Sequence, residues 1–445
     1  MSELPTGWSH FSLRDFGGLS GGKTPSKANL SFWSSPDVPW VSPKDMKRKL
    51  LVDAEDRISQ LAVEDAGMTL YPAGSVLMVT RSGILQHTFP VALAGAELTV
   101  NQDIKVLRPV EGITPQFAFY LLKSFGGEIL SACSKDGTTV QSIDSEKLEA
   151  FPFPLPPAAE QTRIAAKLDE LLAQVDTLKA RIDGIPALLK RFRQSVLAAA
   201  VSGRLTEEWR KAGKAIPHLR IGDVCDFRNG FAYKSSDYKK DGIPLVRISD
   251  IDGRYAFPSD EIYIDQSLCD ERYLISQGDL LIAMSGATTG KIGVYIGDAP
   301  ALQNQRVGNF LVNSKGQITS EYRNIAISQM AGEIIKSAYG GAQPNISSKE
   351  ICALRINVPS IDEQTEIVRR VEQLFAFADQ LEAKVASAKS RIDHLTQSIL
   401  AKAFRGELVP QDPNDEPASV LLERIKAQRA AAPKAKRGRR AATPS

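Results

Sequence analysis

The sequence predicts an α+β protein in which two globular α/β domains alternate with two long helices. The first observation behind this prediction is an internal repeat, because Gln161 returns as Gln364, an offset of 203 residues. The second is a long segment in each copy whose apolar residues are spaced alternately by four and three positions. The third is a set of short β-type runs that precedes each long segment. We therefore expect the order domain, helix, domain, helix, related by an internal pseudo-two-fold repeat.

The two globular domains are expected at residues 1–157 and 214–358, since 445 residues are too many for a single core. In the first domain, the runs at 75–80 and 98–100 have the composition of strands, and residues 115–125 that of a helix. The second domain repeats this framework at the same offset and differs elsewhere. Strands that alternate with only one or two short helices favour an α+β domain over a doubly wound sheet.

The two long helices are expected at residues 158–206 and 359–408, the first of them after the proline-rich connector at 151–157. An average apolar spacing of about 3.5 residues is typical of a coiled-coil seam, so we expect the two copies to be each other's partner. Pro186 predicts a kink in the first helix, because proline lacks an N–H group and crowds the preceding turn. The seam positions are Ile164, Leu168, Leu171, Val175, Leu178 and Ile182 in the first helix, and Ile367, Val371, Leu374, Ala378, Leu381, Val385, Ala388, Ile392, Leu395 and Ile399 in the second.

The net charge of +3 is concentrated in one place, because residues 424–445 hold eight Lys and Arg residues and no acid. Removing these eight charges from +3 leaves −5 for residues 1–423, so the folded body lacks the broad basic field of an autonomous nucleic-acid binder. The C-terminal segment, residues 409–445, ends in this basic tail, which we expect to be disordered. The tail either contacts phosphates or only keeps the protein solvated.

The composition also limits the compartment and the chemistry. The sequence has no apolar run of membrane-spanning length and no N-terminal signal, so we expect a soluble, cytoplasmic protein with no membrane partner. Its four cysteines and four histidines are scattered, which predicts free thiols and no metal site.

The pattern of divergence points to two binding faces held at a fixed distance. The domains share framework residues and differ elsewhere, whereas the helical segments keep their length to the residue. A helix of about 40 residues is about 60 Å long, enough to hold two modules a turn of DNA or more apart. The alternative is a duplicated domain on a structural stalk that binds no nucleic acid.

Polar residues lie in loops at repeat-equivalent places in the two domains. Gln and Asn pair with adenine and Arg pairs with guanine in the major groove, while Gly, Ser and Thr allow close approach to phosphates. For each residue the alternative is ordinary turn chemistry or a buried amide that satisfies the backbone. The candidate DNA contacts are Lys23, Thr24, Arg81, Ser82, Gly83, Asn101, Gln102 and Gln141 in the first domain, and Ser285, Gly286, Thr288, Thr289, Lys291, Gln303, Asn304, Gln305, Arg306, Gln343 and Asn345 in the second.

Motifs for catalysis are missing from the sequence. The loop at 286–291 resembles a phosphate-binding loop, but only three residues separate its glycines and Ile292 follows Lys291. We find no nucleophile elbow, no HExxH motif and no Asn/Asp-Pro-Pro-Tyr/Phe loop of an amino-methylating enzyme. We therefore expect no catalytic residues in this chain.

Several of these motifs together resemble the DNA-specificity (S) subunits of Type I restriction-modification systems. The resemblance covers nearly all of residues 1–410. It rests on the Pro-rich lead into Glu-Gln-Thr-x-Ile at 156–164 and 359–367 and on the Ser-x-Leu…Gly-x-Leu helix ends at 195–205 and 398–408. Each motif alone is modest, but their duplication at one offset is specific.

The resemblance implies two target-recognition domains that each read half of an asymmetric, interrupted DNA site. It implies an antiparallel coiled coil that sets the gap and docks two modification (methyltransferase) subunits, which restriction (endonuclease) subunits then join. No cofactor would be bound by this chain, and S-adenosylmethionine, ATP and Mg would belong to the partners. Helix packing and partner docking would fall to the duplicated positions Glu160, Gln161, Ile164, Gln194, Ser195 and Gly203, with Glu363, Gln364, Ile367, Gln397, Ser398 and Gly406.

Three other functions stay open at this point. A coiled-coil adaptor for proteins would show no selective DNA binding, and an enzyme acting alone would modify DNA as purified. A specificity subunit of a modification-only system would lack a nuclease partner. The recognised bases do not follow from residue types, because loop geometry decides which base edge a side chain meets.

Overall fold

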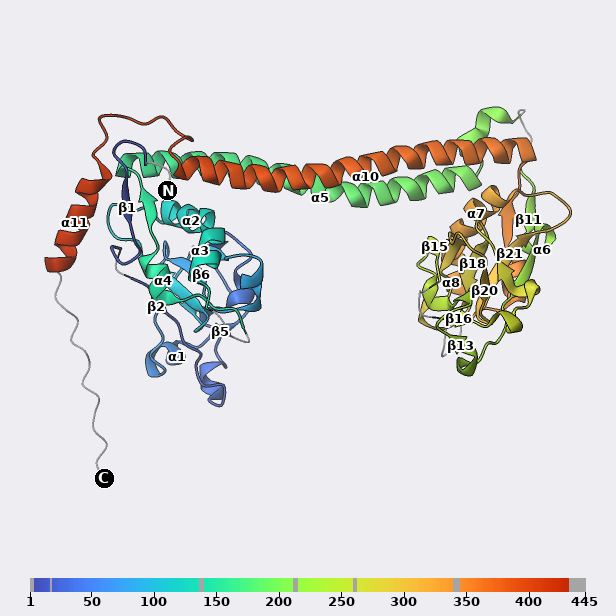
Figure 1. Cartoon of the computed structure of the whole chain (residues 1–445), viewed down its shortest axis with the longest axis horizontal. Coiled ribbons are helices and arrows are strands. Elements are labelled where there is room, and N and C mark those ends of the chain that lie inside the picture. Colours follow the sequence, from blue (N-terminus) through green and yellow to red (C-terminus); the bar gives the residue numbers. More distant parts are fainter. Residues whose placement is uncertain are drawn as a thin grey trace, which may run out of the picture. The chain divides into compact units, whose positions relative to one another are not determined.

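The computed structural model describes residues 4–16, 18–135, 140–210, 215–258, 262–338 and 345–431. The chain divides into two compact units, of which the first combines Met1–Ile182 with Ala388–Ser445 and the second is Asp183–Ser387. Each unit holds one globular domain and a stretch of two paired helices (Figure 1). The two long helices, α5 (Ala158–Val201) and α10 (Ile361–Phe404), pass through both units and contain 44 residues each. Among the described residues, no helix is long and apolar enough to span a membrane.

The first domain contains one large mixed sheet and two smaller ones. The large sheet has the strand order β2-β9-β6-β7-β4, and the small sheets are β5-β3-β8 and β1-β10. The strands are β1 (Ser9–Phe11), β2 (Ser20–Gly21), β3 (Val38–Val41), β4 (Leu50–Leu51), β5 (Arg57–Ile58), β6 (Val76–Val79), β7 (Val91–Ala94), β8 (Thr99–Val100), β9 (Ile104–Leu107) and β10 (Phe153–Leu155). The helices are α1 (Gln60–Asp65), α2 (Pro115–Ser124), α3 (Gly126–Cys133) and α4 (Ser145–Ala150).

The second domain repeats the large sheet of the first and enlarges one of the smaller ones. The sheet that corresponds to the large sheet has the order β12-β21-β18-β19-β15, and the other sheets are the five-stranded β13-β16-β14-β20-β17 and the two-stranded β11-β22. The strands are β11 (His218–Arg220), β12 (Cys225–Asn229), β13 (Tyr238–Lys239), β14 (Ile243–Val246), β15 (Tyr255–Ala256), β16 (Tyr263–Ile264), β17 (Leu274–Ile275), β18 (Leu280–Ala283), β19 (Ile292–Tyr295), β20 (Ala301–Gln303), β21 (Val307–Val312) and β22 (Arg355–Asn357). The helices are α6 (Ile221–Val224), α7 (Ser320–Gln329), α8 (Ala331–Ala338) and α9 (Ser348–Ala353).

The two large sheets confirm the predicted duplication and the α+β fold class. In each sheet the last strand pair is parallel, β4 with β7 and β15 with β19, and the central pairs are antiparallel. Each central strand is a run of apolar residues, Val-Leu-Met-Val in β6 and Leu-Leu-Ile-Ala in β18, and every one of these residues is buried. Such strands form the middle of a core because both of their faces are covered.

The long helices belong to the cores of the domains. Ile164 and Leu168 of α5 pack in the same apolar cluster as the strands of the first domain. Ile367 and Val371 of α10 do the same in the second domain. Full burial of each such side chain contributes about 1.5–3 kcal/mol, so the start of each helix is held firmly against its domain.

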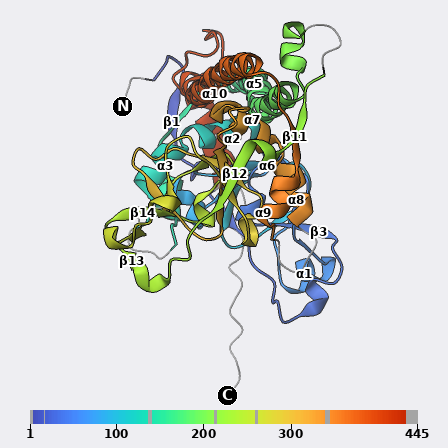
Figure 2. The same cartoon turned by 90° about the vertical axis from the view of Figure 1, so that its right-hand side faces the viewer.

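Within each unit, α5 and α10 pair in an antiparallel arrangement (Figure 1), and Figure 2 shows the two helices side by side in end view. In the first unit, Val175 of α5 is buried in the same cluster as Ile392 and Ile399 of α10. In the second unit, Arg193 of α5 donates to Asp379 and Glu382 of α10, at 2.5 and 2.9 Å. The first half of each helix therefore faces the second half of the other.

The structure corrects two of the predicted seam positions. Leu178 is 47% exposed and Leu395 is 45% exposed, so neither lies in the seam. Leu172, which was not predicted, is buried instead. The cause is geometric, because a stripe assigned at 3.5 residues per turn rotates by about 20° per heptad against a helix with 3.6. Helix α5 does not end at Pro186, and the kink there stays a prediction.

The C-terminal segment also differs from the prediction. Residues 424–431 were placed in a disordered tail, but they belong to helix α11 (Ala418–Ala431), which packs on the first domain. Leu421, Leu422 and Ile425 form a buried apolar stripe on this helix, while its basic residues stay exposed. The prediction of disorder rested on the number of basic residues and overlooked these apolar positions. The rest of the predicted tail, residues 432–445, lies outside the described residues.

Candidate nucleic-acid interface

Two turns come together at one edge of the large sheet in each domain. Because β6 pairs with β9 in antiparallel register, with Val79 opposite Ile104, the loop after β6 lies beside the turn before β9. We call residues 80–86 and 101–103 the first loop pair. The second loop pair is residues 284–291 and 304–306, which follow β18 and precede β21 in the same way. Backbone hydrogen bonds join the loops, from Arg81 N to Asp103 O in the first pair and from Met284 N to Arg306 O in the second.

Asp103 is the centre of the first loop pair, although sequence reasoning did not select it. Its Oδ1 accepts from Nε of Arg81 at 2.6 Å. Its Oδ2 accepts from the side-chain amides of Asn101 and Gln102, at 3.0 and 3.3 Å. The hydroxyl of Thr24 in turn donates to Oε1 of Gln102. The loop pair thus forms one polar network around a single carboxylate.

A third segment lies beside each loop pair. In the first domain, Ser82 N donates to Gln141 O at 3.0 Å, so these two predicted residues are neighbours. In the second domain, Ser285 forms a β-bridge with Asn345, which brings together two further predicted residues. Gln343 lies outside the described residues.

A fourth segment approaches each loop pair through a glycine. Lys23 N donates to Val100 O, and a Cβ on the preceding Gly22 would lie only 1.8 Å from that oxygen. In the second domain, Phe231 N donates to Gln303 O, and a Cβ on Gly230 would lie 2.2 Å from it. No larger residue fits at either glycine. Phe231, which is 46% exposed, therefore occupies the place of Lys23 and joins the candidate contacts.

The equivalence of Lys23 and Phe231 could not be found from the repeat offset. Gly22 and Gly230 are 208 residues apart, whereas the framework repeats at 203, so the two segments were not aligned. The Gly-Gly and Asn-Gly pairs before Lys23 and Phe231 were the only available signal.

For three of the predicted DNA contacts, the structure supports the alternative, which is ordinary turn chemistry or a buried polar group that satisfies its neighbours. Gln303 is fully buried, and its Nε2 donates to the carbonyls of Arg228 and Val307 at 2.8 and 2.7 Å. Thr289 is buried, and its hydroxyl donates to Gly286 O at 2.7 Å, as in an ordinary turn. Asn101 is also buried, with its amide bound to Asp103. Buried amides and hydroxyls satisfy backbone or neighbouring groups and are not available to a ligand.

The other predicted residues are at least partly accessible. In the first domain, Arg81 and Gly83 are exposed, as are Lys23, Thr24 and Gln102. The accessible residues of the second domain are Ser285, Gly286, Thr288, Lys291, Asn304, Gln305, Arg306 and Asn345. Within the part of the chain that the structure describes, the side chains of Asn304, Gln305 and Arg306 have no hydrogen-bond partner, which leaves them available to a ligand.

The duplicated Glu-Gln motif fastens each long helix to its domain. Gln161 Nε2 donates to Pro156 O at 3.0 Å, and the equivalent Gln364 Nε2 donates to Pro359 O at 2.9 Å. Glu160 accepts from the indole of Trp8 at 3.0 Å. Burial raises the pKa of Glu160, and the bond to Trp8 only partly offsets this effect. These residues therefore serve packing.

Glu363 is the counterpart of Glu160 in the second unit. It accepts from the hydroxyl of Thr206 at 2.7 Å and from Arg210 at 2.5 Å, both of which lie after the end of α5. The glycines that follow the long helices, Gly203 and Gly406, have φ values of +75° and +77°. Glycine is favoured there because a left-handed residue closes the last helical turn.

The duplicated Gln-Ser motif has no such internal role. Gln194 and Ser195 on α5 are exposed, and so are Gln397 and Ser398 on α10. These four side chains are accessible to a partner, as are the duplicated Thr162 and Thr365.

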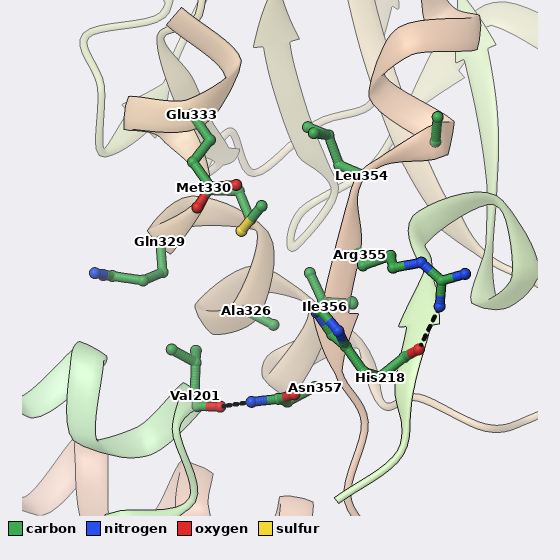
Figure 3. Close-up of a pocket in the computed structure, with 11 residues that line it drawn as sticks. Val201, His218, Ala326, Gln329, Met330, Glu333, Leu354, Arg355, Ile356 and Asn357 are labelled. Atoms are coloured by element: carbon green, nitrogen blue, oxygen red, sulfur yellow. Dashed lines mark hydrogen bonds between the residues drawn. The ribbon is translucent and has the colours of Figure 1, made fainter. Parts of the chain in front are cut away.

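A cavity of about 450 Å³ lies between the end of α5 and helices α7 and α8 in the second unit. Val201, Met330 and Ile356 line it together with His218 and Arg355 (Figure 3). Two of its polar side chains are engaged with the backbone, since Arg355 donates to His218 O at 2.9 Å and Asn357 donates to Val201 O at 2.8 Å. The cavity belongs to the junction of helix and domain. The described residues contain no cluster of His, Cys, Asp and Glu that could hold a metal ion, and all four cysteines are free.

Comparison with known proteins agrees with this architecture. The family model of the Type I restriction modification DNA specificity domain matches residues 5–187 and again 218–388. The specificity subunit of the Type I restriction enzyme EcoKI from Escherichia coli strain K12 is 38% identical over 353 residues, which are 73% of this chain and 74% of that protein. The chain is therefore a protein with two DNA-specificity domains. It belongs to the family of Type I restriction enzyme specificity subunits.

Solved structures show the same fold at lower sequence identity. The HsdS subunit from Thermoanaerobacter tengcongensis is 21% identical and gives a TM-score of 0.59, covering 92% of this chain and 99% of that one. A structure from a study of complex assembly and conformational transition of the type I R-M system is 21% identical, with a TM-score of 0.65 over 92% of this chain and all of that one.

Proposed function

We propose that each domain reads one half of an asymmetric, interrupted DNA site and that the coiled coil sets the spacer between the halves. The observation that carries the proposal is the contrast between the two loop pairs. They occupy the same place in the same topology, yet Arg81 and Asp103 of the first domain correspond to Met284 and Arg306 of the second at the 203-residue offset. One scaffold with two different sets of polar side chains suits two different half-sites.

The helices suit a spacer because they are equal in length. Both α5 and α10 contain 44 residues, and each begins inside the core of one domain. A change in helix length would move one domain relative to the other by about 1.5 Å per residue.

The coiled coil would also dock two methyltransferase subunits. The exposed Gln194 and Ser195 and their counterparts Gln397 and Ser398 offer polar contacts at duplicated positions. The helices also expose large apolar side chains, including Leu188 at 55% and Phe377 at 56%. Exposed apolar groups on paired helices mark an interaction surface.

Catalysis would then belong to the partners. The sequence lacks the motifs of a methyltransferase or a nucleotide-binding enzyme, which supports a subunit that only recognises DNA and assembles the complex. We propose that S-adenosylmethionine is bound by the methyltransferase subunits, and ATP and Mg by the restriction subunits. Without a nuclease partner, the same chain would serve a modification-only system.

A matched insertion tests the spacer. Seven residues of helical sequence are added after Ile182 in α5 and after Ser387 in α10, where the two compact units meet in the sequence. One heptad keeps the seam in phase and adds about 10 Å, or about three base pairs. Methylated adenines are mapped in DNA exposed to the reconstituted complex. We expect the same half-sites with a gap longer by about three base pairs, and an unchanged gap would contradict the spacer role.

A further inference from the structure

We infer that Arg81 reads a guanine in the half-site of the first domain and that Asp103 is the residue that positions it. The inference rests on the proposed function, because it names the base and the side chain within one of the two readers. It comes from which N–H donors in the polar network of the first loop pair already have hydrogen-bond partners and which do not.

The guanidinium of Arg81 is held by one edge only. Its Nε donates to Oδ1 of Asp103 at 2.6 Å, and the carboxylate lies deeper, at 19% side-chain exposure against 55% for Arg81. Within the described part of the chain, Nη1 and Nη2 of Arg81 have no hydrogen-bond partner. These two nitrogens are the parallel donors that match O6 and N7 of guanine in the major groove.

The neighbouring amides are not free to act as readers. Asn101 is 5% exposed, donates to Oδ2 of Asp103 at 3.0 Å and accepts from Asp103 N at 3.0 Å. Gln102 uses its nitrogen on the same Oδ2 and its oxygen on the hydroxyl of Thr24. Adenine recognition uses the oxygen and the nitrogen of an amide together, and in both amides these two atoms already have partners. Each amide nitrogen keeps one further N–H, but Arg81 is the side chain of this network that keeps two parallel nitrogen donors.

The network also fixes the position of Arg81 before DNA arrives. The main chain is anchored, because Thr80 N and Arg81 N both donate to Asp103 O, at 2.8 and 3.3 Å. The side chain is anchored through Nε, and two amides fix the Asp103 carboxylate in turn. A pre-oriented arginine loses less conformational freedom on binding than a free one, which favours selectivity.

The second domain shows that the fold does not require this pair. At the 203-residue offset, Arg81 becomes Met284 and Asp103 becomes Arg306. Arg306 is exposed and forms no ion pair with any described residue. An arginine positioned by a carboxylate is therefore found in the loop pair of the first domain and not in that of the second, which provides a control.

The test uses the full chain reconstituted with its methyltransferase partner and a DNA library randomised over the recognised site. The half-site that is unchanged when residues 214–358 are exchanged is assigned to the first domain. Arg81→Ala should lower the preference for guanine at one position of that half-site by roughly 5- to 150-fold. Arg81→Lys, which keeps the charge but loses the two parallel donors, should relax the same position. Asp103→Asn should relax it partly, and Arg306→Ala should affect only the other half-site.

The outcomes separate this inference from the proposed function. A first half-site without any guanine, or a guanine preference that survives Arg81→Ala, would overturn the assignment of Arg81 while the bipartite site stands. A uniform loss of binding without a change in base preference would show a phosphate contact and would also overturn it. If the wild-type complex selects no bipartite site, the proposed function fails, and the inference fails with it.

Discussion

Replacement of Ile392 by Asp should unfold the first unit far more easily than the same replacement at Leu395, three residues later on the same helix. Ile392 is 8% exposed and belongs to the core cluster that contains Val175 and Ile399. Leu395 was expected in the same seam but is 45% exposed. The pair therefore tests where the seam of the coiled coil lies, with the helix and the introduced residue held constant.

The expected magnitude follows from burial. Loss of a buried Ile side chain costs about 1.5–3 kcal/mol, and an unpaired carboxylate in the same place costs several kcal/mol more. We expect Ile392→Asp to lower the free energy of unfolding by about 4 kcal/mol or more, a large part of a typical total of 5–15 kcal/mol. Leu395→Asp loses only partly buried area and some helix propensity, so its cost should stay below about 1 kcal/mol.

Urea unfolding followed by tryptophan fluorescence measures the difference. Trp8, Trp33 and Trp40 lie in the first unit and only Trp209 lies in the second, so the signal reports mainly on the unit that carries both substitutions. Equal losses for the two variants would refute the assignment of the seam. A larger loss for Leu395→Asp would refute it as well.

Two further predictions concern residues that the sequence singled out for other reasons. Burial raises the pKa of Glu160 above its ordinary value of 4.5, so its contribution to stability is fully present below pH 4.5 and is lost as the pH rises through the folded-state pKa. Glu160→Gln should therefore gain stability relative to the wild type between pH 4.5 and 7, and parallel stability curves would contradict this. Gln303→Leu should cost about 1–3 kcal/mol, because the carbonyls of Arg228 and Val307 each lose a donor. Gln305→Leu changes an exposed side chain and should cost little stability. Equal losses for the two variants would contradict the structural role of Gln303.

Long-range periodicity and repetition were sufficient to predict the architecture. The exact offset between Gln161 and Gln364 located two helices of equal length, and the apolar spacing identified Ile164 and Ile367 as core residues. Such patterns depend on the local geometry of a helix, which the sequence encodes directly. Leu178 was predicted in the seam but is exposed, because a small error in the assumed period accumulates along a helix.

The candidate interface was predicted less completely, because it depends on contacts between distant segments. The role of Asp103 follows from the pairing of β6 with β9, which sets the carboxylate beside Arg81. Phe231 was not predicted because it lies 208 residues after Lys23 and not 203, so the repeat offset did not align the two residues. Gln303 and Gln305 look alike in sequence, and only the strand that contains Gln303 explains why one is buried and the other exposed.

Exchange of residues 214–358 for the corresponding domain of another specificity subunit tests the central claim most directly. The exchanged chain is reconstituted with the methyltransferase, and methylated adenines are mapped beside those of the wild type. Independent readers on a common spacer predict that one half-site changes while the other half-site and the gap stay the same. A change in both half-sites, or in neither, would contradict the claim that each domain reads its own half.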